Sequence, residues 1–339
     1  MKTLTFFFRH PLPTYFSMEK LFHSVAGEIS RVSSGLFSIK EQELPFTSKP
    51  ATIRKNISFV RKSQSQINHI TGDAHYTILG CSKKNINILT IHDCVLLHRY
   101  PKSSPRHWII RWLWYQLPVR KADAVTVISE NTKRELIFFT GCSEKKIHVI
   151  TNFIDPLFKP EPRVFNYTRP KLLFIGTTPN KNLERTIDAI KGMEVELIIV
   201  GFLNERQKTL LKRKKINYRI LSELSDAAMR DLYAESDIML FPSTYEGFGL
   251  PIIEAQATGR PVLTSSLEPM ISVAGGAACM IDPFRSESIR QGLKKIIENE
   301  AYRNELVEKG FENVKRFQLE RVALQYSVIY SKLIAEKEN

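Results

Sequence analysis

Short apolar runs alternate with segments of helical spacing along most of this 339-residue chain. Runs rich in β-branched and aromatic residues occur at L-T-F-F-F (4–8), N-I-L-T-I (87–91), A-V-T-V-I (124–128) and K-L-L-F-I (171–175). Helix-period or loop-length segments separate them. This alternation is typical of a parallel β-sheet flanked by helices. We therefore predict an α/β fold.

One segment breaks the alternation. Residues 156–170 contain four prolines, which disfavour a helix or an inner strand. We predict an N-terminal domain over 1–158, a linker over 159–169 and a C-terminal domain over 170–318. The last helix, about 319–339, is a candidate to pack back on the first domain. Ligands of open α/β sheets bind beyond the carboxyl ends of the strands, so the loops after strands are the expected sites of chemistry.

The charge of the chain is unevenly distributed. The net charge is +14, and residues 1–158 hold 22 Lys+Arg against 11 Asp+Glu. This excess favours an anionic partner, such as nucleic acid, lipid headgroups or a phosphorylated acceptor. The four cysteines form no C-x-x-C pair, which predicts reduced thiols in a cytoplasmic protein. No apolar stretch approaches the roughly 18 residues that span a bilayer, so any membrane contact is expected at the surface.

Two glutamates bracket the stretch F-P-S-T-Y-E-G-F-G-L-P-I-I-E, residues 241–254. Glu246 is predicted on a loop, and Glu254 in a helix that runs from Leu250 to Thr258 and stops at Gly259. Free N–H groups at a helix start can bind phosphate, and carboxylates accept hydrogen bonds from hydroxyls. A nucleotide sugar offers both groups. The alternative is a helix with an ordinary N-terminal glutamate.

The segment E-G-F-G-L-P-I-I-E resembles the E-x7-E signature of the retaining glycosyltransferases of family 4. That family has the GT-B fold, in which two Rossmann-like α/β domains face each other across a cleft. The resemblance to this family covers nearly the whole chain, which is also similar to bacterial polysaccharide mannosyltransferases. Further blocks resemble those of the family, in the usual order: T-I-H-D (90–93), A-D-A-V-T-V-I-S-E-N-T (122–132), K-I-H-V-I-T-N-F-I-D (146–155) and L-L-F-I-G-T-T-P-N-K-N-L (172–183).

The resemblance implies a donor site in the C-terminal domain. Glu254 would hold the ribose diol, Glu246 would contact the transferred sugar, and Lys181 would neutralise the diphosphate leaving group. Thr177 stands where the family often has an arginine, so a clamp of two cations is not implied. The other residues implied along the donor are Gly176, Thr178, Asn182, Gly247, Phe248, Gly249 and Leu250, together with Thr177 itself.

The resemblance also implies a candidate residue on the acceptor side. His92 would face the transferred sugar, where a neutral imidazole can hydrogen-bond a hydroxyl or the leaving phosphate. The alternative is a His-Asp pair that bonds to local backbone. The other acceptor-side candidates are Arg9, Ser17, Asp73, His75 and Asp93, and for Asp73 and His75 an ordinary loop role is equally compatible with the sequence.

All three tryptophans lie in H-W-I-I-R-W-L-W-Y, after a basic loop. Helical spacing predicts that Trp108, Trp112 and Tyr115 share one face. An interfacial helix on an anionic membrane has this composition, with the segment Trp108–Tyr115 at headgroup depth. The alternative is a buried helix of the first domain.

The function implied is metal-independent, retaining transfer of a hexose from a nucleotide sugar to a lipid-linked or surface-polysaccharide acceptor. The donor would be GDP-, UDP- or ADP-linked, and mannose is the favoured hexose. No cofactor and no metal are expected, and the chain has no D-x-D dyad. The enzyme would be cytoplasmic or peripheral on the inner face of the plasma membrane. Alternatives are a sugar-nucleotide epimerase or glycan phosphorylase, a Rossmann-type dehydrogenase, and a basic nucleic-acid-binding protein. The last two lack a recognisable motif.

Overall fold

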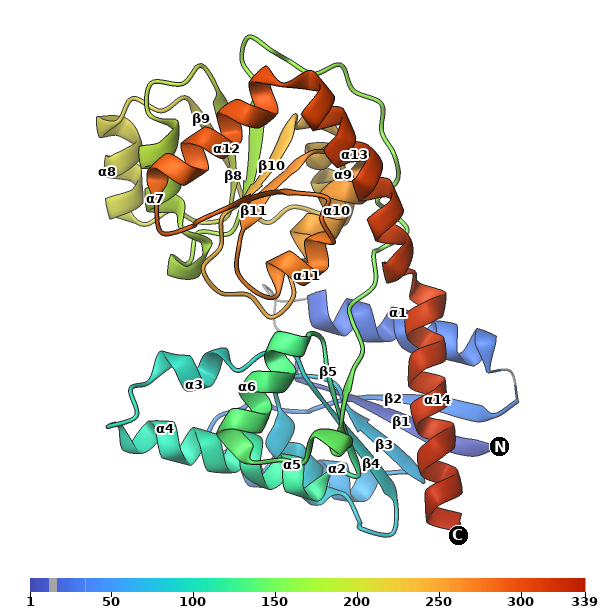
Figure 1. The fold of residues 1–339 in the computed structure, drawn as a ribbon. Coiled ribbons are helices and arrows are strands. Elements are labelled where there is room, and N and C mark those ends of the chain that lie inside the picture. Colours follow the sequence, from blue (N-terminus) through green and yellow to red (C-terminus); the bar gives the residue numbers. More distant parts are fainter. Residues whose placement is uncertain (12–16, 34, 339) are drawn as a thin grey trace. The chain divides into compact units, whose positions relative to one another are not determined.

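The computed structural model describes residues 1–11, 17–33 and 35–338 (Figure 1). The chain divides into two compact units, the first formed by 1–153 and 318–339 and the second by 154–317. Each unit holds one six-stranded sheet in which all strand pairs are parallel. The α/β fold class predicted from the alternating pattern is confirmed.

The first sheet has the strand order β2-β1-β3-β4-β5-β6. The strand order reverses between β1 and β3, which makes this pair the topological switch point of the first unit. Its strands are β1 (Lys2–Phe8), β2 (Phe37–Glu43), β3 (Ile67–Ile70), β4 (Ile86–Ile91), β5 (Ala124–Val127) and β6 (Ile147–Val149). Its helices are α1 (Ser17–Val32), α2 (Ile53–Ser63), α3 (Val95–Arg99), α4 (Pro105–Ile110), α5 (Leu117–Lys121), α6 (Glu130–Thr140) and α14 (Leu319–Glu338), with helical turns η1 (His75–Gly80), η2 (Arg111–Gln116) and η3 (Glu144–Lys146).

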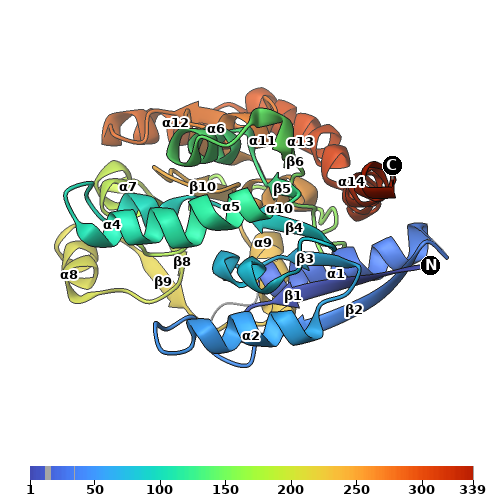
Figure 2. The ribbon, with the colours of Figure 1, turned by 90° about the horizontal axis from the view of Figure 1, so that it is seen from below.

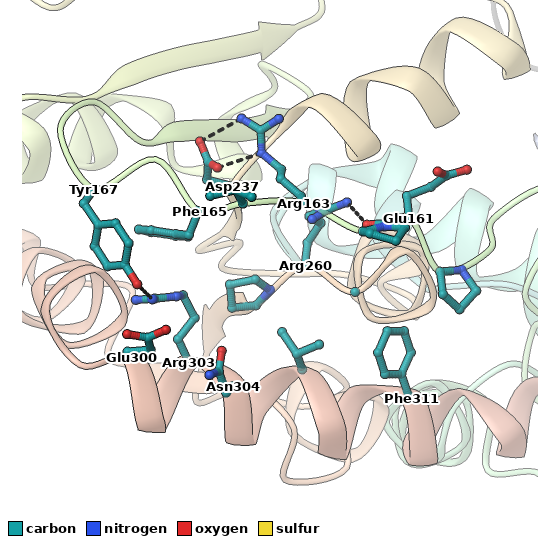
Figure 3. A pocket seen from close by; sticks show the side chains of 16 residues that line it. Glu161, Arg163, Phe165, Tyr167, Asp237, Arg260, Glu300, Arg303, Asn304 and Phe311 are labelled. Carbon is teal, nitrogen blue, oxygen red and sulfur yellow. Dashed lines mark hydrogen bonds and ion pairs between the residues drawn. The ribbon is translucent and has the colours of Figure 1, made fainter.

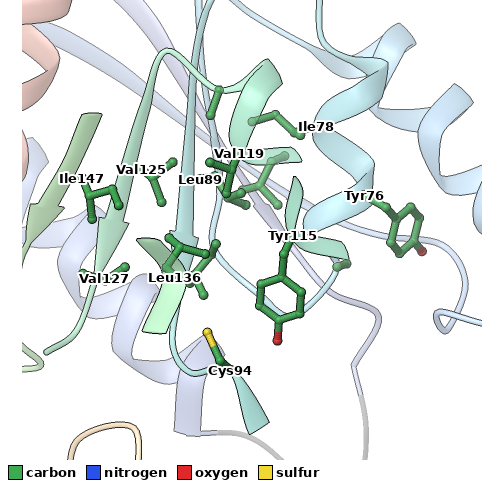
Figure 4. Packing of buried hydrophobic residues seen from close by; sticks show 14 of the residues in the cluster. Tyr76, Ile78, Leu89, Cys94, Tyr115, Val119, Val125, Val127, Leu136 and Ile147 are labelled. Carbon is green, nitrogen blue, oxygen red and sulfur yellow. The ribbon is translucent and has the colours of Figure 1, made fainter. Parts of the chain in front are cut away.

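The side chains of β1 divide between the two faces of this sheet. Phe7 packs on the face that α5 and α6 cover. Val119 and Leu136 belong to the same cluster (Figure 4). Phe6 and Phe8 pack on the opposite face with residues of α1 and α14. Successive strand residues point to opposite faces, so an unbroken apolar run marks a strand that is covered on both sides.

The last helix, α14, belongs to the first unit. Its Tyr330 hydroxyl lies 2.7 Å from Nδ1 of His69, whose Nε2 lies 2.7 Å from the hydroxyl of Thr90. Near the ends of the described chain, Lys2 and Glu338 form an ion pair of 2.8 Å. The chain therefore passes between the two units twice, after residue 153 and after residue 317.

We expect His69 to make the first unit sensitive to mild acid. Burial lowers the pKa of His69 from 6.5 to about 3. Below pH 6.5 the unfolded chain binds a proton at His69 that the folded chain does not bind. Stability therefore falls with a slope that approaches about 1.4 kcal/mol per pH unit, and by about 1.6 kcal/mol between pH 6.5 and pH 5. Urea midpoints at the two pH values measure this loss. His69→Gln should reduce the pH dependence by this amount, while His75 and His92, whose pKa values burial also lowers, keep their own contributions. An unchanged pH dependence would contradict the assignment.

The helical run from α4 to α5 contains a π-helical turn, η2. Figure 2 shows α4 and α5 as parts of one long helical run. The backbone N–H of Leu117 donates to the carbonyl oxygen of Trp112, five residues earlier. Pro118 has no N–H to donate to the carbonyl oxygen of Trp114. The His75 ring hydrogen-bonds to that oxygen instead, with Nδ1 at 3.0 Å.

The predicted common face of Trp108, Trp112 and Tyr115 is wrong. Trp108 and Trp112 are 51% and 54% exposed, but Tyr115 is buried. The wider π turn rotates Tyr115 towards the core, where its ring lies 5.4 Å from that of His75. The segment is therefore exposed at Trp108 and Trp112 and buried at Tyr115, which neither interpretation of the sequence predicted.

The second sheet has the strand order β12-β11-β10-β7-β8-β9, and its topological switch point lies between β10 and β7. Its strands are β7 (Lys171–Ile175), β8 (Glu196–Val200), β9 (Tyr218–Leu221), β10 (Ile238–Phe241), β11 (Val262–Ser265) and β12 (Cys279–Ile281). Its helices are α7 (Leu183–Ile190), α8 (Glu205–Arg213), α9 (Asp226–Glu235), α10 (Leu250–Thr258), α11 (Met270–Ala274), α12 (Ser286–Glu298) and α13 (Glu300–Val314), with turns η4 (Pro179–Lys181) and η5 (Lys315–Phe317).

The segment 159–169 contains no helix or strand, as its prolines predict. It lines a cavity of about 690 Å³ together with α13 and the residues that precede β10 and β11 (Figure 3). Arg163 donates to the Asp237 carboxylate at 2.7 and 3.2 Å, and Arg303 donates to the Tyr167 hydroxyl at 2.7 Å. These bonds hold the segment on the second unit. The cavity lies at the amino ends of the strands, opposite the edge where ligands bind in such sheets.

The four cysteines, all within the described residues, form no disulfide bond. Among the described residues, no helix combines the length and the apolar content that crossing a bilayer requires.

Candidate functional site

Two loops meet at the switch point of the second sheet. One follows β7 and the other follows β10, so both leave the carboxyl edge of neighbouring strands. Thr244 donates its backbone N–H to the carbonyl oxygen of Asn180 at 2.7 Å. The Asn180 side chain donates in return to the carbonyl oxygen of Tyr245 at 2.9 Å. These bonds hold the two loops together, and side chains from both can act on one ligand.

Lys181 and Glu246, one from each loop, are in direct contact. Lys181 Nζ lies 2.6 Å from Glu246 Oε1, and both side chains are largely buried. The ammonium group also lies 5.0 Å from the centre of the Phe241 ring. The structure thus brings together the residue predicted for the diphosphate and the residue predicted for the sugar. The sequence did not predict that they pair with each other.

A glycine leaves room for the lysine. Gly176 has φ +88°, and a Cβ atom there would lie 3.0 Å from carbons of the Lys181 side chain. Any side chain at this position would be strained and would displace Lys181. Gly176 therefore acts through its backbone and its lack of a side chain.

Helix α10 begins and ends at the predicted residues, Leu250 and Thr258. Gly249 precedes it with φ +111°, and Gly259 follows it in a left-handed conformation. Within the described part of the chain, the backbone N–H groups of residues 247–250 make no hydrogen bond to another backbone group. The start of the helix therefore presents a run of donors beside Glu246, which is the arrangement that binds an anion.

Glu254 lies in the second turn of α10 and is held by Tyr233 of α9. The Tyr233 hydroxyl donates to Glu254 Oε2 at 2.6 Å. Burial, with the neighbouring Glu254 charge, raises the pKa of Tyr233 well above its ordinary value. Tyr233 therefore stays protonated and acts as a fixed donor. One carboxylate oxygen is thus oriented by the protein.

Three other predicted donor residues bond mainly to the protein itself. The Asn182 amide donates to the carbonyl oxygen of Pro283 at 2.6 Å and to that of Pro242 at 3.1 Å. Thr177 donates to the carbonyl oxygen of Phe202 at 2.6 Å, and the Thr178 hydroxyl donates to the side chain of Asn180 at 2.8 Å. These bonds fix the loop after β7.

Charged residues also gather at the switch point of the first sheet. Arg9 follows β1 and pairs with Glu19 in the first turn of α1. The Arg9 guanidinium lies 3.6 Å from the carboxylate of Asp73, which follows β3. The side chain of Ser17, another predicted residue, lies outside the described part of the chain.

His92 and Asp93 follow β4. His92 Nε2 lies 2.8 Å from the carbonyl oxygen of Thr71, which can only accept, so this nitrogen carries the proton. Burial lowers the pKa of His92, so its ring is neutral at pH 7 and Nδ1 is its acceptor. The Asp93 carboxylate accepts the N–H of Val95 at 2.9 Å, and burial raises its pKa. Both residues make the local backbone bonds that the alternative interpretation expected.

His75 is placed differently from the other candidates. It is 3% exposed, hydrogen-bonds to η2 and packs on Tyr115. Burial lowers the pKa of His75 to about 4, so it is a neutral structural residue at pH 7.

Sequence analysis missed three residues that shape these edges: Glu19, Asn180 and Tyr233. Glu19 has only the common signature of an acidic residue in a first helical turn. Asn180 lies in a predicted loop, but nothing in the sequence identifies the second loop to which it bonds. Tyr233 reads as a core residue of an amphipathic helix. In the described residues, no cluster of three or more His, Cys, Asp or Glu side chains is arranged to hold a metal ion.

Two family models match consecutive parts of the chain. Residues 158–313 match the family described as "Glycosyl transferases group 1", and residues 36–157 match "Glycosyltransferase Family 4". The chain belongs to the glycosyltransferases. Its fold is the GT-B fold of these proteins.

This glycosyltransferase is similar to two bacterial mannosyltransferases. It is 28% identical to O-antigen chain mannosyltransferase B of Escherichia coli over 165 residues, which cover 45% of this chain and 43% of that protein. It is 25% identical to the MMP alpha-(1->4)-mannosyltransferase of Mycolicibacterium hassiacum over 271 residues, 73% of this chain and 66% of that protein. Neither match reaches two thirds of the relative's own length.

The fold is also that of a solved structure, Anabaena Alr3699/HepE in complex with UDP and glucose. The two chains superpose with a TM-score of 0.77 at 16% identity, over 98% of this chain and 100% of that chain.

Proposed function

We propose that this glycosyltransferase moves a hexose, with mannose favoured, from a nucleotide sugar to a lipid-linked or surface-polysaccharide acceptor, with retention at the anomeric carbon. The observation that carries the donor part is the meeting of Lys181, Glu246 and the start of α10 at one switch point, with Glu254 one turn further along. The family assignment favours this function over the epimerase and nucleic-acid-binding alternatives.

Each group at this edge suits one part of a nucleotide sugar. The Glu254 carboxylate is held in place by the Tyr233 hydroxyl, and carboxylates are strong acceptors for the hydroxyls of a ribose diol. Lys181 and the backbone N–H groups of residues 247–250 supply positive charge and donors for the diphosphate. Glu246 accepts hydrogen bonds from hydroxyls of the sugar.

The ion pair between Lys181 and Glu246 couples these roles. When a diphosphate draws the Lys181 ammonium towards itself, the Glu246 oxygen that accepted from it becomes available to a sugar hydroxyl. Negative charge grows on the diphosphate as its bond to the sugar breaks, so Lys181 and the N–H groups bind it more strongly in the transition state than in the ground state.

Retention is proposed through attack on the face from which the diphosphate leaves, with Glu246 orienting the sugar rather than acting as a nucleophile. The bond between the anomeric carbon and the phosphate oxygen breaks, and the acceptor oxygen bonds to the same carbon. The acceptor's hydroxyl proton passes to the departing phosphate oxygen, and a nucleoside diphosphate is released. His92, neutral with Nδ1 as its acceptor, is proposed to orient a hydroxyl.

The choice of mannose and of the acceptor rests on the relatives named above, of which one acts on O-antigen chains. The neighbour that holds UDP and glucose keeps UDP-sugars among the donors to be tested. We further propose a cytoplasmic location at the inner face of the plasma membrane, where a lipid-linked acceptor would be met.

Nucleotide binding tests the donor assignment first. Thermal unfolding is measured with UDP, GDP, ADP and dTDP, each with and without EDTA. We expect GDP to raise Tm, since a ligand at 100 times its Kd adds about 2.7 kcal/mol of stability. EDTA should leave the shift unchanged. If no nucleotide raises Tm, or if the shift requires a divalent metal, the metal-free donor site is wrong. A glycosyl product of inverted anomeric configuration would rule out retention alone.

A further inference from the structure

We propose that the first unit carries a docking face for an anionic lipid bilayer, formed by α4, η2 and α6. The face consists of Trp108, Ile109, Trp112 and Phe138, and is called the aromatic face below. Their side chains are 51%, 58%, 54% and 69% exposed. This inference rests on their exposure and on nearby charge, and it stands independently of the proposed sugar transfer.

Two separate segments build the aromatic face. Trp108, Ile109 and Trp112 come from the run α4–η2, and Phe138 comes from α6. The Arg111 side chain donates to the carbonyl oxygen next to Phe138, that of Phe139, at 2.7 Å, and so fixes the two segments to each other. The aromatic face is therefore held together by the fold of the first unit.

Cations lie directly on these rings. Lys102 Nζ is 5.5 Å from the centre of the Phe138 ring, and the Arg111 guanidinium is 5.0 Å from that of Trp108. Residues 95–121 contain six Lys+Arg and no Asp or Glu. Large apolar side chains mixed with cations match the boundary between anionic headgroups and acyl chains. This charge complementarity favours an anionic lipid surface as the occupant.

The polar groups of the aromatic face allow its side chains to move from water into the boundary between headgroups and acyl chains. The Trp108 indole N–H donates to the carbonyl oxygen of Lys102 at 2.9 Å, so the ring can enter an apolar layer without losing a hydrogen bond to water. The stems of Lys102 and Arg106 can lie along acyl chains while their charges stay at headgroup level.

The π turn explains why only part of the tryptophan cluster faces outward. Trp108 and Trp112 are exposed, while the Trp114 indole N–H donates to the carbonyl oxygen of Asp73 at 2.9 Å. Asp73 belongs to the charged edge at the switch point of the first sheet. Only two positions along the helical run therefore separate Trp112 of the aromatic face from Trp114, which is bonded to that edge. If the proposed function holds, docking places this edge close to a membrane-borne acceptor.

Binding to lipid vesicles tests the docking face. The protein is sedimented with phosphatidylcholine vesicles and with vesicles that contain 30% phosphatidylglycerol, at about 0.1 M and 0.5 M NaCl. We expect binding only to the anionic vesicles, weaker at the higher salt. Trp108→Ser with Trp112→Ser should lower the partition coefficient at least tenfold, and Lys102→Gln with Arg106→Gln should lower it about tenfold or more.

Two matched controls remove similar groups elsewhere on the same unit. Val328→Ser changes an exposed apolar residue of α14, and Arg61→Gln with Lys62→Gln removes two exposed cations of α2. Both should bind vesicles as the parent does. Acyl chains brominated near the headgroup should quench the tryptophan fluorescence of the parent, which tests insertion without any substitution.

Several results would overturn the proposal. These are equal binding to neutral and anionic vesicles, parental binding by the double tryptophan variant, or the absence of quenching by brominated lipid. A parent that dimerises through this face, with dimers abolished by the same variant, would make it a protein interface instead. The nucleotide-induced Tm shift of the variants in solution is expected to stay parental, so failure of docking is distinguishable from failure of the donor site.

Discussion

Replacing Glu254 by glutamine is expected to lower kcat/KM for the nucleotide sugar about 100-fold. Glutamine keeps the size of the side chain and an acceptor for the Tyr233 hydroxyl, but it removes the negative charge that is proposed to hold the ribose diol. Hydrogen bonds to charged groups contribute about 1.5–3 kcal/mol each, and 2.7 kcal/mol corresponds to 100-fold. Steady-state rates and the Kd of the nucleoside diphosphate measure the loss, and both should change together.

Two companion variants separate binding from folding. Glu308→Gln removes an exposed carboxylate of α13 and should have parental kinetics. Tyr233→Phe keeps the charge of Glu254 and removes only the hydroxyl that donates to it, so it should weaken nucleotide binding less than Glu254→Gln does. A Glu254→Gln enzyme with parental kcat/KM and a parental melting temperature would remove Glu254 from the donor site.

Replacing Lys181 by methionine is expected to lower kcat by 100-fold to 1000-fold. Methionine keeps most of the apolar stem that lies beside Gly176, but it removes the charge proposed to stabilise the leaving diphosphate. Removal of one preorganised donor from a developing anion costs about 2.7–4 kcal/mol in other enzymes. Because the effect belongs to the transition state, KM should change much less than kcat.

The contact between Lys181 and Glu246 requires a further control. Lys181→Met leaves the largely buried Glu246 carboxylate without its cation, which can destabilise the loop by itself. The double variant Lys181→Met with Glu246→Gln removes both charges, and its melting temperature separates this effect from catalysis. Lys191→Met, at an exposed lysine after α7, is the matched surface control. A kcat within twofold of the parent for Lys181→Met would contradict the proposed role.

The sequence predicted the second unit's edge well because local chemistry determines it. The prolines and glycines around 241–259 allow only a strand, a turn and a short helix in that order, and α10 starts and stops as predicted. The spacing of Glu246 and Glu254 follows from that local structure. The contacts of these residues do not, because Lys181 and Tyr233 come from distant segments that only the tertiary fold brings near.

The features that the sequence did not predict also depend on contacts between segments that are distant in sequence. Strand β2 has the polar sequence F-S-I-K-E-Q-E, since it is an edge strand that pairs only with β1, and it shows no apolar run. The π turn depends on Pro118 together with a histidine more than 40 residues away in sequence, so helical spacing alone misplaced Tyr115. The pairing of Arg9 with Glu19 depends on how α1 packs against the end of β1.

The return of α14 has a consequence for the order in which the protein can be made. The second unit is one continuous segment, so all of its residues are synthesised before Tyr326 and Tyr330 of α14. The first unit still lacks Tyr326 and Tyr330 at that stage, and His69 has no tyrosine hydroxyl to meet its Nδ1. Domains usually mature from the N-terminus onward during synthesis. Here the first unit can be completed only after the second unit has been synthesised, because α14 follows the second unit in the chain.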